Sequence, residues 1–121
     1  MEEIRLGAVE SRFADIIWSN EPIPSGELVK KCEKELCWKK STTYTVLKKL
    51  CEKGIFKNEN GTVTSLISKK ELESHQSEKF VEDNFEGSLP AFIAAFTRRK
   101  SLSRKDAEEI KRMLDSFEEV K

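Results

Sequence analysis

The spacing of apolar residues predicts an amphipathic helix near the start of the chain. Residues 7–19 carry apolar side chains at intervals of three and four, the period of one helix face. The stripe consists of Val9, Phe13, Ile16 and Ile17, with Trp18 beside them. We expect this face to pack on a core.

A second, shorter helix should follow closely. Pro22 and Pro24 end the first helix, because proline fixes φ and biases the residue before it away from the helical region. Ser25 is placed to cap the next helix, which extends over about ten residues. Its apolar side holds Leu28, Val29, Cys32 and Leu36.

A third helix is predicted from Thr42 to Lys53, and its two faces differ in chemistry. Gly54 is placed to end it. The inner face holds Thr43, Val46, Leu47, Leu50 and Cys51. The outer face is basic, hydroxylated or aromatic, with no acid among its members Ser41, Thr42, Tyr44, Thr45, Lys48 and Lys49.

The residues after this helix predict a β-hairpin. Segments 55–57 and 62–67 have the composition of short strands, and Asn60 with Gly61 forms a strong turn signal between them, since both residues tolerate positive φ.

Three further helices are predicted in the last fifty residues. Ser68 and Glu71 form a capping box for the first, which continues to about Phe85. Ser88 caps the second, and Ser103 caps the third. Their apolar positions are Leu72, Phe80, Val81 and Phe85, then Leu89, Phe92, Ile93 and Phe96, then Ala107, Ile110, Met113, Leu114 and Phe117.

Charge is distributed unevenly, although the 121-residue chain has a formal net charge of zero. Residues 1–70 carry thirteen Lys and Arg against ten Asp and Glu, whereas residues 71–121 carry nine against twelve. The excess is concentrated between Lys30 and Lys57, where nine Lys face three Glu. A local basic stretch on a neutral chain indicates an anionic partner for that stretch.

The order of elements favours a mainly α fold. We expect a winged helix-turn-helix of three helices and a β-hairpin wing over residues 1–69, then a helical dimerisation region over residues 70–121. The third helix would enter the DNA major groove, where cations neutralise phosphates and hydroxylated or aromatic side chains reach base edges. The expected DNA-binding residues are Lys39, Lys40, Ser41, Thr42, Tyr44, Thr45, Lys48 and Lys49. Two alternatives stay open: a merely solvated face, or a winged-helix module that grips a protein.

The C-terminal helices should need a partner, because fifty residues bury too little surface to be stable alone. A second copy related by a two-fold axis would cover the apolar stripes and place two recognition helices on a palindromic DNA site. The alternative is that the three helices pack against the chain's own hairpin. The expected dimerisation residues are Phe80, Phe85, Leu89, Phe92, Ile93, Phe96, Ile110, Leu114 and Phe117.

Several segments together resemble the BlaI/MecI/CopY family of penicillinase and copper-responsive repressors. The resemblance spans about residues 5–118, and its most specific parts are Trp18, the Thr-x-x-Thr of Thr42 and Thr45, and the Leu-x-x-Lys-Gly that ends at Gly54. The other matching segments are Leu28 and Val29, residues 38–50, Lys53–Ile55, and Gly87–Phe92.

That resemblance implies a homodimeric repressor, with a winged helix on a palindromic operator and C-terminal helices that hold the dimer. It also implies that Ser41, Thr42, Tyr44, Thr45 and Lys49 face DNA. The chain departs from the family at Lys39-Lys40-Ser41, where Ser-Pro-Lys is usual, and at Tyr44, where a basic residue is frequent. The end of the wing also lacks the family's tyrosines. The familiar operator sequence is therefore not expected to carry over.

The resemblance further implies two routes of induction. In the penicillinase branch a regulatory protease cuts an Asn-Phe bond, and the aligned pair here is Ala95-Phe96. In the copper branch a C-terminal cysteine cluster binds metal, but no Cys follows Cys51. The first route is the better match.

Enzymatic, metal and membrane chemistry are not expected. His75 is the only histidine, and Cys32, Cys37 and Cys51 lack zinc-site spacing and suit reduced thiols. The glycines form no phosphate-binding loop, and no apolar run or leader predicts a membrane span or export. We therefore expect a cytoplasmic protein without a cofactor.

Overall fold

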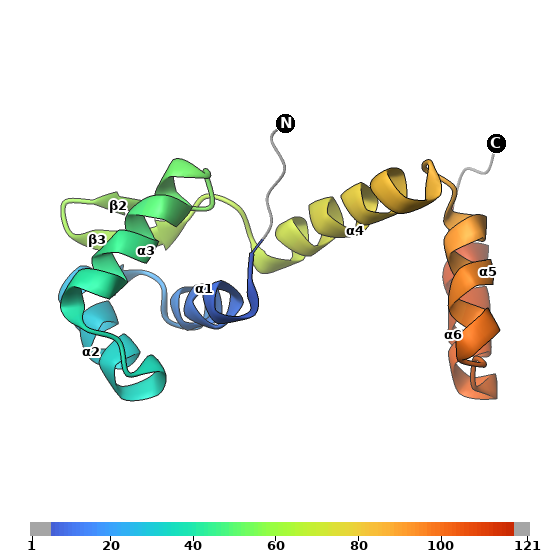
Figure 1. Ribbon diagram of the computed structural model, residues 1–121, viewed down its shortest axis with the longest axis horizontal. Coiled ribbons are helices and arrows are strands. Elements are labelled where there is room, and N and C mark those ends of the chain that lie inside the picture. Colours follow the sequence, from blue (N-terminus) through green and yellow to red (C-terminus); the bar gives the residue numbers. More distant parts are fainter. Residues whose placement is uncertain (1–5, 118–121) are drawn as a thin grey trace. The chain divides into compact units, whose positions relative to one another are not determined.

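The computed structural model describes residues 6–117, which form a mainly α, winged-helix architecture with a small antiparallel sheet (Figure 1). This confirms the predicted fold class. The elements are α1 Ala8–Asn20, β1 Ile23–Pro24, α2 Ser25–Leu36, α3 Lys40–Glu52, β2 Phe56–Glu59, β3 Thr62–Ser65, α4 Lys69–Phe85, α5 Leu89–Arg99 and α6 Arg104–Asp115.

The contacts divide the chain into two compact units between Lys79 and Phe80. The N-terminal unit contains α1 to β3 and the start of α4, where Leu72 is buried and Lys69 forms an ion pair with Asp15 of α1 at 2.9 Å. The C-terminal unit contains the end of α4 with α5 and α6. The functional division at residues 69 and 70 stays a prediction.

The core of the N-terminal unit forms where the first three helices and the sheet meet. Phe13 and Ile17 of α1 and Leu28 of α2 have no exposed surface, and Leu50 of α3 joins them. Phe56, Ile55 and Val63 close the core from the hairpin side. The helical periodicity therefore predicted the buried faces well.

Two residues of these helices differ from expectation. Val9 was predicted to face the core but is 50 % exposed in the first turn of α1. Ser25 was predicted as a capping residue, but the helix begins at Ser25 itself, with Pro24 at the cap position and no side-chain cap. Its hydroxyl instead accepts a hydrogen bond from Tyr44 at 3.1 Å.

The sheet has three strands in the order β1-β3-β2, one more than the sequence predicted. The extra strand, β1, is only Ile23 and Pro24, which pair with β3. A two-residue strand containing proline leaves no alternating pattern to detect. The predicted hairpin turn is confirmed: Asn60 and Gly61 have φ of 54° and 82°, the positive values that a tight hairpin turn requires.

The helix caps predicted in the last fifty residues are confirmed. Ser68 and Glu71 exchange the two hydrogen bonds of a capping box, each at 3.1 Å. Ser88 accepts from the Ala91 backbone N–H, and Ser103 accepts from that of Asp106. Capping residues act within one turn of chain, so a short sequence pattern was enough to locate these three caps, whereas the cap predicted at Ser25 was wrong.

Candidate nucleic-acid interface

Helix α3 presents most of the predicted DNA-binding residues to solvent. Its inner side is fixed by Thr43, Leu47 and Leu50, which are buried in the core. The predicted residues with exposed side chains are Lys39, Lys40, Ser41, Thr42, Thr45, Lys48 and Lys49. One helix thus displays the set on the side away from the core, with Tyr44 at its margin.

The amino end of α3 is held by the segment before it. The ring of Trp38 packs on Phe13 of the core, with centroids 5.4 Å apart. Lys39 is extended, and its carbonyl accepts hydrogen bonds from the backbone N–H of Thr43 at 3.1 Å and from the Thr43 hydroxyl at 3.3 Å. The first turn of α3 is therefore anchored while Lys39 and Lys40 remain exposed.

Tyr44 is half-buried at the side of α3 nearest α2. Its hydroxyl donates to Ser25 at the start of α2, and the Ser25 backbone N–H donates to Gly61 in the wing turn at 2.8 Å. These contacts join α3, α2 and the wing through one serine. The Tyr44 ring thus contributes to packing as well as to the surface.

Lys49 is engaged by an acid from another helix. Its ammonium lies 2.8 Å from Glu10 of α1, whose other oxygen accepts from the Gly7 backbone N–H at 3.1 Å. The hydrogen bond from Lys49, together with that from Gly7, lowers the pKa of the Glu10 carboxyl below its ordinary value. Glu10 of the same chain therefore neutralises part of the Lys49 charge.

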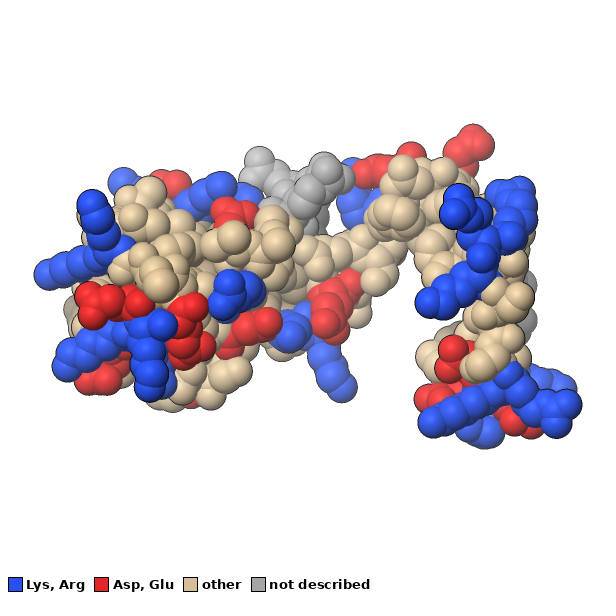
Figure 2. Space-filling model, turned by 60° about the horizontal axis from the view of Figure 1, so that its bottom comes forward, with Lys and Arg blue, Asp and Glu red and all other residues tan. Residues whose placement is uncertain are grey.

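The carboxyl end of the α3 face also carries an acid of its own. Glu52 is exposed and lies four residues after Lys48, so the two side chains share one side of the helix. The expectation that this face lacks acids therefore holds for its amino-terminal half only. Figure 2 shows acidic and basic side chains intermixed on the face of the molecule in that view.

The wing adds one cation that the predicted set omitted. Lys57 of β2 is half-exposed and lies 3.7 Å from Glu59 on the same strand. The net charge of residues 30–57 includes Lys57, so composition pointed to it, but only the fold places it on β2, the strand that contacts α3.

The C-terminal unit leaves its predicted dimerisation residues open to solvent. Four phenylalanines form a ring cluster, with the Phe85 and Phe92 centroids 5.5 Å apart and Phe80 and Phe96 each about 6 Å from Phe92. Phe85 and Phe92 are partly buried by this cluster. The other predicted dimerisation residues have between 37 and 58 % of their surface exposed: Phe80, Leu89, Ile93, Phe96, Ile110, Leu114 and Phe117.

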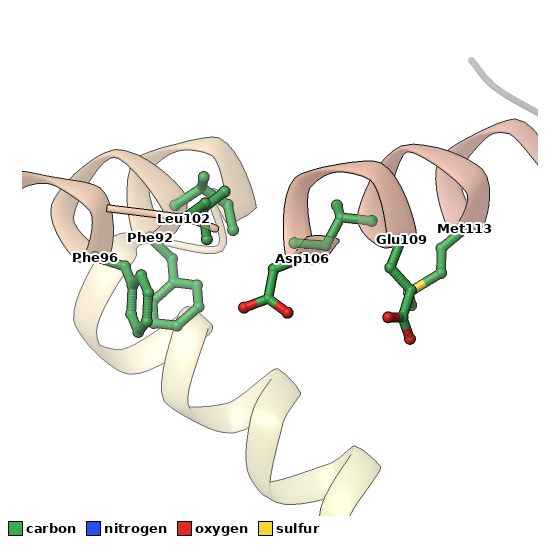
Figure 3. Close-up of a pocket in the computed structure, with 8 residues that line it drawn as sticks. Phe92, Phe96, Leu102, Asp106, Glu109 and Met113 are labelled. Carbon is green, nitrogen blue, oxygen red and sulfur yellow. The ribbon is translucent and has the colours of Figure 1, made fainter. Parts of the chain in front are cut away.

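A groove between α5 and α6 gathers several of these side chains. Its volume is about 370 Å³, and its walls include Phe92 and Phe96 of α5 and Met113 of α6. Figure 3 shows these side chains on the two helices, with the Asp106 and Glu109 carboxylates beside the apolar surface. Such a surface is typical of a protein contact with a polar rim.

These features agree with the comparisons to known proteins. The family model described as penicillinase repressor matches residues 6–116. The chain belongs to the penicillinase repressor family. Both parts of the chain, the winged helix and the C-terminal helices, fall inside the match.

Relatives match over nearly their whole length. The methicillin resistance regulatory protein MecI of Staphylococcus aureus strain N315 is 20 % identical over 114 residues, covering 91 % of this chain and 93 % of the relative. MecI of Mammaliicoccus sciuri matches to the same extent. The penicillinase repressor of Bacillus licheniformis is 23 % identical over 121 residues, covering 97 % and 94 %.

Residues 6–117 form neither a candidate metal site nor a membrane-spanning helix. No three His, Cys, Asp or Glu side chains in this range come together as a metal site, and none of its helices is long and apolar enough to cross a membrane. The three cysteines are free thiols, and burial raises the pKa of Cys32 and of Cys51. Cys37 is exposed.

Proposed function

We propose that this chain is a DNA-binding transcriptional repressor that acts on a palindromic operator as a homodimer and controls genes of β-lactam resistance. The observation that carries the proposal is the exposed face of α3 beside a wing, in a chain of the penicillinase repressor family. The names of the relatives, which regulate methicillin resistance or repress penicillinase, support the choice of genes. We propose no enzymatic activity.

Within α3, we assign base contacts to the amino-terminal half of the face. Helix-turn-helix proteins read bases with the amino-terminal residues of the recognition helix. Ser41, Thr42 and Thr45 lie there with Lys39 and Lys40, away from Glu10 and Glu52. Thr45 donates its hydroxyl hydrogen to the Ser41 carbonyl at 2.9 Å, so its oxygen is oriented to accept a hydrogen bond. We assign phosphate contacts to Lys39, Lys40, Lys48 and Lys57.

The test is selection of DNA from a randomised duplex pool by the full chain, followed by titration of the selected duplex and of a mixed-sequence duplex. We expect the selected sequences to be palindromic and to bind at least a thousandfold more tightly than mixed sequence. Thr42→Ala should change the preferred bases, whereas Lys40→Ala should weaken both duplexes alike. A chain that retains no sequence from the pool would contradict the proposal.

The proposed dimer contact is the apolar surface of α5 and α6 with the phenylalanine cluster. A second copy fits this surface because an isologous interface places the same exposed side chains on both sides of the two-fold axis. The carboxylates at the groove edge would form the polar rim.

We propose that proteolysis between Ala95 and Phe96 releases the repressor from its operator. Both residues lie inside α5, where helical structure protects the backbone, and the Phe96 carbonyl accepts from Lys100 at 3.2 Å. Cleavage there would remove Phe96 and α6 from the dimer, and untethered half-sites lose avidity by a factor on the order of 10²–10⁴. A chain truncated after Ala95 that binds the selected palindrome as tightly as the full chain would exclude this route.

A further inference from the structure

The register of the sheet shows where β1 stops and what replaces it. Ile23 pairs with Val63 and Pro24 with Thr62. Continuing this antiparallel register would place Pro22 opposite Thr64 and Glu21 opposite Ser65. Ser25 donates its backbone N–H to Gly61, so Ile23 and then Glu21 occupy the hydrogen-bonding positions toward β3, and Pro22 between them does not. The paired part of β1 begins at Ile23, so the Ser65 backbone N–H lies beyond the paired backbone of β1.

The Glu21 side chain occupies the vacant ladder position. Its Oε1 accepts the Ser65 backbone N–H at 2.8 Å, and the Ser65 hydroxyl lies 2.8 Å from Oε1 and 2.9 Å from Oε2. A carboxylate that accepts from a backbone N–H forms a charge-assisted hydrogen bond, which is stronger than a neutral one. Glu21 thus extends the pairing of β3 by two residues beyond the backbone of β1.

Trp18, three residues earlier on α1, holds the hairpin next to this contact. Its indole Nε1 donates to the Ile67 carbonyl just after β3 at 3.1 Å, and its ring packs on Phe56 of β2 with centroids 5.4 Å apart. The end of α1 therefore touches both strands of the wing at their base. We refer to Trp18, Glu21 and Ser65 as the wing latch.

The latch matters because a two-stranded hairpin is marginally stable alone and takes its position from what it packs against. Beyond the latch, the hairpin is tied to the helices at its turn by the hydrogen bond from Ser25 to Gly61. Lys57, the wing cation, follows Phe56 directly, so a shift at the base moves this cation.

We propose that Glu21 is a positioning residue that sets the wing, and with it Lys57, against the DNA that α3 binds. The inference rests on the proposed DNA binding. Glu21 touches no DNA in this proposal and acts through Ser65 and the hairpin.

The experiment compares Glu21→Ala, Glu21→Gln and Thr64→Val in the full chain. Thr64→Val is the matched control, because Thr64 neighbours Ser65 on β3 and its hydroxyl is buried without a hydrogen-bond partner, so its loss breaks no contact. Glu21→Gln keeps one oxygen that can accept from Ser65. Each variant is titrated against the duplex selected by the wild-type chain, with and without Lys57→Ala.

We expect Glu21→Ala to weaken binding about tenfold, the size of effect of a hydrogen bond to a charged group. Glu21→Gln should recover part of the loss, and Thr64→Val should match the wild type. In the Lys57→Ala background, Glu21→Ala should weaken DNA binding little further, because the Lys57 contact that Glu21 positions is already absent. An equal loss in both backgrounds would overturn the positioning role and leave Glu21 with a merely structural one.

Hydrogen exchange in the absence of DNA tests the latch independently of the proposed function. The Ser65 amide and the amides of β2 and β3 should exchange faster in Glu21→Ala than in Thr64→Val. Unchanged exchange would overturn the latch even where the chain binds its operator. Faster exchange in a chain that selects no DNA would instead uphold the latch and contradict the proposed function alone.

Discussion

The two units of the chain bury apolar surface in opposite ways. In the N-terminal unit, residues such as Phe13, Leu50 and Phe56 have no exposed surface, and three helices share one core with the sheet. In the C-terminal unit, neither α5 nor α6 has a buried residue, although both are amphipathic. Hydrophobic burial is the main favourable term in folding, so the first unit carries its stability within itself and the second should obtain it from a partner.

The sharpest way to test this contrast is to damage the N-terminal core. Phe13→Ala removes a fully buried ring that also supports Trp38 before α3, and we expect it to lower the free energy of unfolding by about 3–5 kcal/mol. Urea denaturation followed by Trp fluorescence measures the change. The loss should not depend on protein concentration, and Val9→Ala, at an exposed position of the same helix, should stay within about 0.5 kcal/mol of the wild type. A strong concentration dependence would show that the unit is not self-sufficient.

The second test charges the surface of the C-terminal unit. Phe92→Glu places a carboxylate in the ring cluster and groove, and we expect it to weaken the dimer by more than about thirtyfold, as at an interface hot spot. Sedimentation should then change from about twice the 13.9 kDa chain mass to the monomer, while the N-terminal unit stays folded. Glu108→Gln on α6, an exposed position outside the groove, is the control. A dimer of unchanged affinity would place the interface elsewhere.

Sequence predicted the elements whose signals are local. The Ser68, Ser88 and Ser103 caps and the Asn60–Gly61 turn depend on a few adjacent residues, and the helix stripes depend on a period of about four. The contacts that the sequence did not predict join residues far apart in the chain. Glu21 meets Ser65 and Glu10 meets Lys49 only after folding, and neither pair leaves a spacing signal.

The candidate site follows the same rule. The exposed face of α3 was predictable from helical periodicity, because its residues share one element. The ion pair of Lys49 with Glu10 was not predictable, because α1 supplies the acid. The apolar stripes of α5 and α6 indicated that something must cover them, and the partner itself is not encoded in any spacing.

The electrostatic difference within α3 gives a smaller effect. Lys48→Ala should flatten the dependence of log affinity on log salt by about one unit per half-site, the value for one phosphate contact. Lys49→Ala should change it by clearly less, because Glu10 already holds the Lys49 ammonium. Titrations of a mixed-sequence duplex at several salt concentrations measure both slopes. Equal slopes for the two variants would mean that DNA displaces Glu10 from Lys49.

The smallest effect that we predict concerns the pH dependence of the Glu10–Lys49 pair. The pKa of Glu10 is lowered in the folded chain, so ionised Glu10 stabilises the fold above its ordinary pKa of 4.5. That contribution should be lost as pH falls through the lowered folded value. Glu10→Gln keeps an oxygen that can accept from Gly7 but has no charge. The free energy of unfolding of the wild type should therefore exceed that of the variant by no more than about 1 kcal/mol near neutrality, and by progressively less in acid. Chemical denaturation of both proteins across this range measures the difference, and a gap that widens as pH falls would contradict the assigned pair.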